Sequence, residues 1–180
     1  MADCTKKEML QPSLLERLKD DEPGKQTESH DKSIMSFSRL RASVLQDLNW
    51  LLNSICFETG DEELKAYPEV RKSVINFGIR NFSGLTAGSK SDEVLERAIE
   101  DAILNFEPRI IPQSLRVHVV GEDELDSPDF KADHYDEHRY PNIVVFKIEG
   151  DLWAEPMPEH LYLKSVLDLE LGQIEVKEDS

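Results

Sequence analysis

The first apolar pattern along the chain predicts a helix over residues 39–57. Its apolar positions recur in steps of three or four, which keeps them on one face of a helix. They are Leu40, Val44, Leu48, Leu51 and Ile55. Ser38 is suited to cap the start of this helix. The amphipathic face indicates that the helix packs against a core.

A shorter apolar stripe follows the Tyr67-Pro68 pair. Proline suits the first turn of a helix. The apolar positions of the stripe are Val70, Val74, Ile75 and Phe77. Gly78 follows them, where a glycine commonly ends a helix. We therefore expect a second, short helix over residues 68–77.

The clearest helical pattern begins at Ser89 or Ser91 and ends before Pro108. Its apolar face is made by Val94, Leu95, Ala98, Ile99, Ala102, Ile103 and Phe106. Pro108 stops the helix, because the residue before a proline avoids helical angles.

Beyond Pro108 the apolar period changes to two, which is typical of strands. Alternation is found over residues 115–119 and 161–169, and a final short strand is expected around Ile174 and Val176. Residues 142–150 are apolar at both parities, which predicts a central strand buried on both faces. Helices followed by strands define an α+β fold. We expect about three N-terminal helices packed on a small antiparallel sheet of three to four strands.

The first 37 residues are expected to be a flexible tail that precedes a single domain over residues 38–176. Residues 19–36 are polar and contain proline and glycine, as linkers do. Before them, residues 13–18 form a short amphipathic segment with Leu14, Leu15 and Leu18. One or two turns are not stable alone in water. We expect the segment to dock, either onto this protein or onto a partner.

The charge of the chain restricts its partners. The 180 residues contain 21 Lys and Arg against 37 Asp and Glu, a formal net charge of −16. Such a chain repels phosphate backbones and anionic membrane surfaces, so we expect neither nucleic-acid binding nor membrane insertion. Residues 121–140 and 149–180 contribute −6 and −7 of this charge. An acidic loop is usually only solvated, but it can also steer a basic partner.

Other features of the sequence favour the cytoplasm. No run approaches the roughly 18 apolar residues of a membrane span, and the N-terminal residues lack the apolar stretch of a signal peptide. Cys4 and Cys56 form neither a disulfide framework nor a zinc spacing.

Two groups of residues could carry chemistry. His134 and His138 are four residues apart and could bind a divalent metal on a helix, but the acidic segment has no apolar face and is better interpreted as a solvated loop. Glu107, Glu155 and Glu159 offer carboxylates, and glycoside hydrolysis needs two of them about 5–9 Å apart across a cleft. The sequence does not place them around one. We expect no cofactor and no metal.

Glu107, Pro108 and Arg109 lie between the third helix and the first strand. They can be interpreted as a helix terminator, with Arg109 bonding the last helical carbonyls. They can also be interpreted as a rigid charged corner that binds a partner. Trp153, in a proline-stiffened loop, is open to two interpretations as well: a core filler or an exposed interface anchor.

Ten short segments, in order, resemble the TssE family of type VI secretion baseplate subunits. That family is similar to the lysozyme-like wedge protein of contractile phage tails. The segments are residues 13–18, 43–53, 67–70, 73–78, 82–85, 106–110, 115–117, 146–156, 161–163 and 167–170. The Glu-Pro-Arg motif is the hallmark of the family and corresponds here to Glu107, Pro108 and Arg109.

The resemblance implies a structural role without catalysis. Family members join a baseplate wedge with TssF, TssG and TssK, and they initiate a contractile sheath of TssB and TssC on the cytoplasmic side of the inner membrane complex. The resemblance also implies that Glu107, Pro108 and Arg109 form an interface with a partner. A sheet with an open edge could accept strands from a neighbour. The alternative function is a peptidoglycan hydrolase, as the description lysozyme-like suggests.

Overall fold

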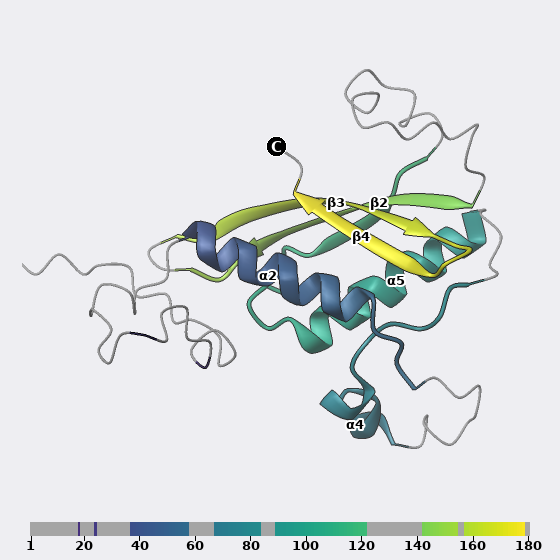
Figure 1. Ribbon diagram of the computed structural model, residues 1–180, viewed down its shortest axis with the longest axis horizontal. Coiled ribbons are helices and arrows are strands. Elements are labelled where there is room, and N and C mark those ends of the chain that lie inside the picture. Colours follow the sequence, from purple (N-terminus) through teal and green to yellow (C-terminus); the bar gives the residue numbers. More distant parts are fainter. Residues whose placement is uncertain are drawn as a thin grey trace, which may run out of the picture.

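The computed structural model describes residues 37–57, 67–83, 89–121, 142–154 and 157–178, together with Leu18 and Gly24. These residues form three α-helices, a short 3-10 helix and four strands (Figure 1). The helices are α2 (Phe37–Leu52), α4 (Pro68–Arg71) and α5 (Ser89–Phe106), and the 3-10 helix is η2 (Val74–Asn76). The strands are β1 (Arg116–Val119), β2 (Ile143–Leu152), β3 (Glu159–Asp168) and β4 (Gln173–Glu178). The predicted α+β class is confirmed.

The four strands form one antiparallel sheet in the order β1-β2-β3-β4. The long strands β2 and β3 pair along their whole length, from Ile143 opposite Asp168 to Leu152 opposite Glu159. Strand β2 lies between β1 and β3, as its apolar residues at both parities predicted. Strands β1 and β4 are therefore the two edges of the sheet.

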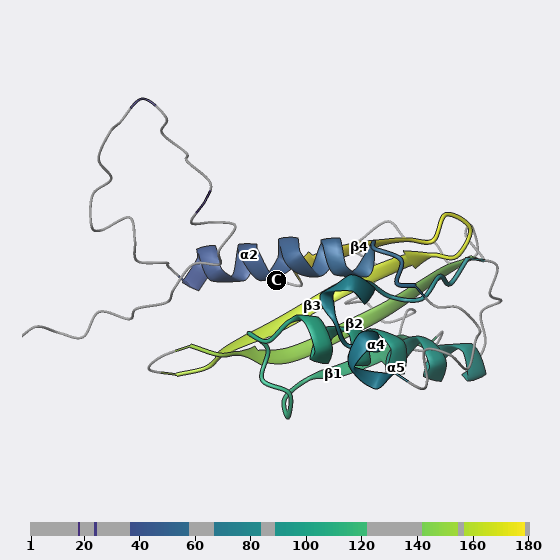
Figure 2. The same ribbon diagram turned by 90° about the horizontal axis from the view of Figure 1, so that it is seen from below.

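Helices α2 and α5 cover the same face of the sheet (Figure 2). Helix α2 lies near β4 and helix α5 near β1. The apolar face of each helix meets the alternate apolar side chains of the strands, and the largest of these are fully buried. They include Leu48, Leu51, Ile99, Ile103, Phe146, Ile148, Leu163 and Leu167. Burial of this apolar area is the main term that holds the layers together.

Helix α2 is shorter than its apolar pattern predicted. The expected helix reached residue 57, but α2 ends at Leu52 and the side chain of Ile55 is 69% exposed. The chain turns because residues 54–56 pair with Ile79: the N–H of Ile79 donates to Ser54 O, and the N–H of Cys56 donates to Ile79 O, both at 2.9 Å. A backbone bridge thus replaces the last helical turn.

The second predicted helix is divided into α4 and η2, with Ser73 in an extended conformation between them. Its apolar stripe does not reach the core: Val74 is 81% and Ile75 is 87% exposed. A four-residue helix is too short to present a continuous buried face. Gly78 follows at φ 126°, in the left-handed region that favours glycine. None of the described helices is long and apolar enough to cross a membrane.

Candidate functional site

Glu107, Pro108 and Arg109 form a corner where α5 leads into the strands. The N–H of Glu107 donates to Ile103 O at 2.8 Å, which is the last helical bond before Pro108. Beyond the corner, the N–H of Trp153 donates to Arg109 O at 2.7 Å, so the chain is joined to the end of β2. The prediction that the helix ends before Pro108 is confirmed.

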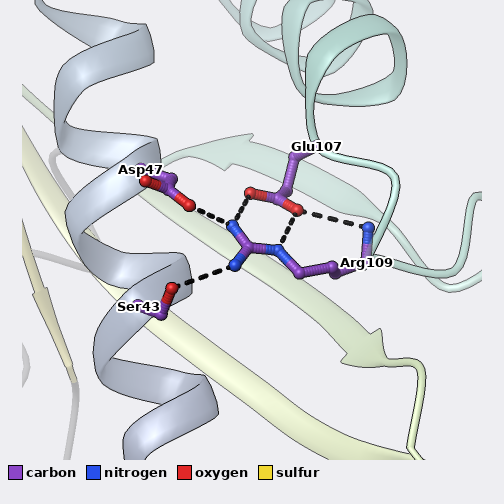
Figure 3. Close-up of polar contacts among 4 residues, drawn as sticks. All are labelled: Ser43, Asp47, Glu107 and Arg109. Carbon is purple, nitrogen blue, oxygen red and sulfur yellow. Dashed lines mark hydrogen bonds and ion pairs between the residues drawn. The ribbon is translucent and has the colours of Figure 1, made fainter. Parts of the chain in front are cut away.

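The guanidinium of Arg109 connects this corner to α2 (Figure 3). Its Nε and Nη2 donate to the two carboxylate oxygens of Glu107 at 2.7 and 2.6 Å. Nη2 also donates to Asp47 Oδ2 at 2.5 Å, and Nη1 donates to Ser43 Oγ at 3.1 Å. Asp47 and Ser43 are one helical turn apart on α2. Arg109 bonds carboxylates and a hydroxyl rather than the helical carbonyls that the terminator interpretation required.

The corner holds a buried carboxylate next to a partly exposed guanidinium. Glu107 is 4% exposed, while the side chains of Arg109 and Asp47 are 24% and 33% exposed. Burial by itself lowers the pKa of Arg109, but the hydrogen bonds and charges of Glu107 and Asp47 outweigh it and raise this pKa above its ordinary value. The guanidinium is therefore charged at every accessible pH, and it compensates the buried Glu107 carboxylate.

A pocket of about 350 Å³ opens beside the corner. It is lined by Asp47, Trp50, Leu51, Phe77, Phe106, Glu107, Pro108 and Arg109. Phe77 and Phe106 meet edge to face, with ring centroids 5.4 Å apart. Trp50 is 47% exposed. The pocket is thus an aromatic hollow with the ion pairs of Arg109 at one side.

Four strongly exposed apolar side chains lie on the chain segments next to the pocket residue Phe77 and to the bridge between Ile55 and Ile79. We call Ile55, Phe57, Val74 and Ile75, which are 68–87% exposed, the apolar patch. Ile75 lies two residues before Phe77 and Val74 three residues before it, and Ile55 bridges to Ile79. Contiguous exposed apolar surface on a soluble protein commonly marks an interaction site.

The remaining sequence candidates do not gather into a site. Trp153 is 61% exposed, which excludes the core-filler interpretation. Glu159 is ion-paired with Arg41 and does not line the pocket beside Glu107. Leu18 is exposed. Leu14, Leu15, Glu155 and the segment with His134 and His138 lie outside the described residues. Among the residues that the structure describes, no three potential ligands are grouped to hold a metal.

Sequence reasoning missed the partners of Arg109 and the walls of the pocket. Ser43 and Asp47 could have been predicted to act together, because polar residues four apart on an amphipathic helix can share one partner. The sequence contains no pattern that predicts the aromatic walls of the pocket. The sequence predicts Phe77 and Phe106 on the apolar faces of two separate helices, and nothing in it predicts that the two rings meet.

The site therefore consists of a partly buried ion-pair corner, an aromatic pocket and exposed apolar side chains nearby. Residues 38–157 match the family model of the baseplate wedge protein gp25. The chain belongs to this family. It is a structural baseplate component of contractile tail-like systems, and the family is not enzymatic. No curated protein and no solved structure matches the chain.

Proposed function

We propose that this chain is the TssE subunit of a type VI secretion baseplate. In this role it joins the wedge with TssF, TssG and TssK, and it initiates the contractile sheath of TssB and TssC. Membership of the wedge family supports the baseplate role. The ordered resemblance over residues 13–172 supports the secretion-system assignment.

The observation that carries the proposal is the apolar patch beside the Arg109 corner. Ile75 and Val74 lie on short, exposed elements and contribute little to the core. Apolar anchors that become buried only in a complex dominate the binding energy of most interfaces. Pro108 and Arg109 line the pocket next to these side chains. We therefore assign the wedge contact to the corner, the pocket and the apolar patch together.

In this proposal the corner both shapes the pocket and contacts the partner. Arg109 holds α2 against the end of α5, and this tie shapes the pocket into which a partner side chain fits. The exposed quarter of the Arg109 side chain remains accessible at the rim. Leu14, Leu15 and Leu18 form a second contact with a partner in this proposal.

The test is to tag the protein in its native cells, purify it gently and identify the co-eluting proteins by mass spectrometry. Ile75→Asp places a charge in the apolar patch and is expected to reduce recovery of TssF, TssG and TssK by about tenfold or more. The matched control is Leu171→Asp, because Leu171 is 68% exposed in the turn between β3 and β4. Clean, partner-free wild-type protein, or an equal loss in both variants, would contradict the proposal.

A further inference from the structure

The pocket beside the Arg109 corner has one negative charge more than it has positive charges. Among the described residues that line it, Asp47 and Glu107 carry carboxylates and Arg109 carries the guanidinium. The guanidinium donates two side-chain hydrogen bonds to Glu107 and one to Asp47. One cation therefore compensates two anions, and the wall of the pocket at Asp47 remains acidic.

Asp47 has a second carboxylate oxygen that is available to a ligand. Its Oδ2 accepts from Arg109 Nη2 at 2.5 Å, whereas no hydrogen bond within the described part of the chain reaches its Oδ1. Figure 3 shows this second oxygen turned away from the guanidinium. The side chain of Asp47 is 33% exposed. A donor from another molecule can therefore bond to the Asp47 carboxylate.

Aromatic side chains form much of the remaining pocket wall. Trp50 follows Asp47 by three residues on α2, so the two side chains lie on the same side of the helix. Phe77 and Phe106 meet edge to face with their ring centroids 5.4 Å apart. The faces of aromatic rings attract cations, and the indole ring attracts them most strongly. A cation at Asp47 would thus be favoured by the rings as well as by the carboxylate.

The charge of the pocket discriminates among three kinds of occupant. An incoming carboxylate would meet the excess negative charge, and each nitrogen of the Arg109 side chain already donates within the corner. A purely apolar side chain would remove water from Asp47 without replacing its hydrogen bond, which costs free energy. A lysine or arginine side chain packs its methylene groups against the rings and donates to the carboxylate.

We propose that this pocket receives one lysine or arginine side chain of the wedge partner, with its methylene stem against Trp50 and Phe77 and its cationic end on Asp47. The proposal rests on the proposed function and specifies the chemistry of the partner at the assigned contact. The volume of about 350 Å³ falls in the size range of small-ligand sites, so one long side chain fits. The net charge of −16 also attracts a basic partner over a longer range.

Small molecules that resemble a lysine side chain test the pocket on the purified full chain. Butylammonium, neutral butanol and butyrate are titrated while NMR follows the indole N–H signals of Trp50 and Trp153. Trp153 does not line the pocket, so it reports the unspecific attraction of cations to the acidic chain. Butylammonium should shift the Trp50 signal at a concentration at least about threefold lower than butanol, and butyrate should have the smallest effect. Equal binding of butylammonium and butanol, or tighter binding of butyrate, would overturn the proposal.

Asp47→Asn tests the carboxylate itself. The variant keeps an oxygen that can accept from Arg109 and removes the negative charge. The preference for butylammonium over butanol should disappear, while butanol should still shift the Trp50 signal because the aromatic walls remain. Asp101→Asn is the matched control, since Asp101 is an exposed residue of α5 outside the pocket. A preference that persists in Asp47→Asn would contradict the proposal, and if this variant does not fold, the three ligands on the wild type decide.

Recovery of partners with the tagged protein connects the pocket to assembly. Asp47→Asn should reduce recovery of the wedge subunits by about tenfold, and Asp101→Asn should leave recovery unchanged. Equal recovery from the two variants would overturn the cationic occupant while the proposed function stands. If the wild-type chain recovers no wedge subunit, the proposed function fails and the cationic partner fails with it.

Discussion

The Arg109 corner and the segment of residues 67–77 line the same pocket but are built in opposite ways. At the corner, Glu107 is buried, and its carboxylate is held by three donors from Arg109: the backbone N–H, Nε and Nη2. In the segment, the apolar side chains of Val74 and Ile75 face solvent. The corner thus buries a charged group and the segment exposes apolar side chains, which is the reverse of the usual distribution in a folded protein. The buried ion pairs of the corner therefore serve folding, whereas the exposed side chains of Val74 and Ile75 are available to a partner.

The largest effect is expected from Arg109→Ala. The variant leaves the Glu107 carboxylate buried without its counter-ion, and breaking a buried pair costs about 3–5 kcal/mol of the free energy of unfolding. Urea titration measures it. The control is Arg97→Ala, which removes an exposed pair with Glu93 and should cost about 0.5 kcal/mol or less. Equal shifts in the two variants would show that the corner does not stabilise the fold.

A conservative second change sharpens this test. Glu107→Gln in the Arg109→Ala background removes the unpaired charge and should recover part of the lost stability. If the double variant is no more stable than Arg109→Ala, the cost comes from lost packing of the arginine and not from the buried carboxylate.

Gly78→Ala is expected to have the next largest effect, because it disturbs the turn that follows the segment of residues 67–77 and lies against Ser54 and Cys56. A Cβ at this position would lie 2.3 Å from Ser54 O, and the φ of 126° is unfavourable for alanine. Backbone strain of this kind costs about 1–3 kcal/mol, before the steric contact is counted. Gly121→Ala is the matched control, because nothing lies within 4 Å of its Cβ position. A free energy of unfolding that falls equally in both variants would exclude the turn as the cause.

The layered core could be predicted from the sequence because each of its elements carries its own period. The steps of α2 and α5, the alternation of β1 and β3 and the two apolar parities of β2 are local signals. Together they predict the α+β class and the central place of β2, but not which helix lies on which strand. The stop at Pro108 and the turn at Gly78 were local signals as well.

The site could not be predicted to the same extent, because its contacts join distant segments. The bonds of Arg109 to Ser43 and Asp47 span more than 60 residues. The exposure of Val74 and Ile75 was missed for the opposite reason: their spacing fits a buried helix face, and only the short length of α4 and η2 prevents burial. A periodic pattern identifies an apolar face but not the protein that covers it.

A smaller effect on the free energy of unfolding is expected when Arg109 is replaced by lysine, and this effect should depend on pH. Since the folded-state pKa of Arg109 is raised above its ordinary value, its stabilisation is complete below that value and is lost only as pH rises through the raised one, beyond the range of unfolding experiments. Lysine titrates near pH 10.4 when unperturbed. The stability difference between wild type and Arg109→Lys should therefore widen above about pH 10, by at most about 1.4 kcal/mol per pH unit.

Urea titration at pH 8 and near pH 11 measures this difference, and the other titrating groups cancel because both proteins carry them. A difference that is equal at the two pH values would mean that the charge of residue 109 does not contribute to folding. The stability difference between wild type and Arg109→Lys would then come only from the different shapes of the two side chains.

The smallest effect on folding is expected at Ile75, and it is the most informative one for the comparison. Ile75→Ala should change the free energy of unfolding by no more than about 0.5 kcal/mol, as exposed positions generally do. Ile99→Ala is the same chemical change at a fully buried position of α5 and should cost about 2–5 kcal/mol. Both are measured by urea titration of the purified chain. If Ile75→Ala costs more than about 1 kcal/mol, the apolar patch is covered in the free protein and is not available to a partner. If Ile75→Ala costs almost nothing while Ile75→Asp reduces recovery of the wedge subunits by about tenfold or more, the Ile75 side chain serves binding and not folding. A residue that contributes to neither process would leave both measurements unchanged.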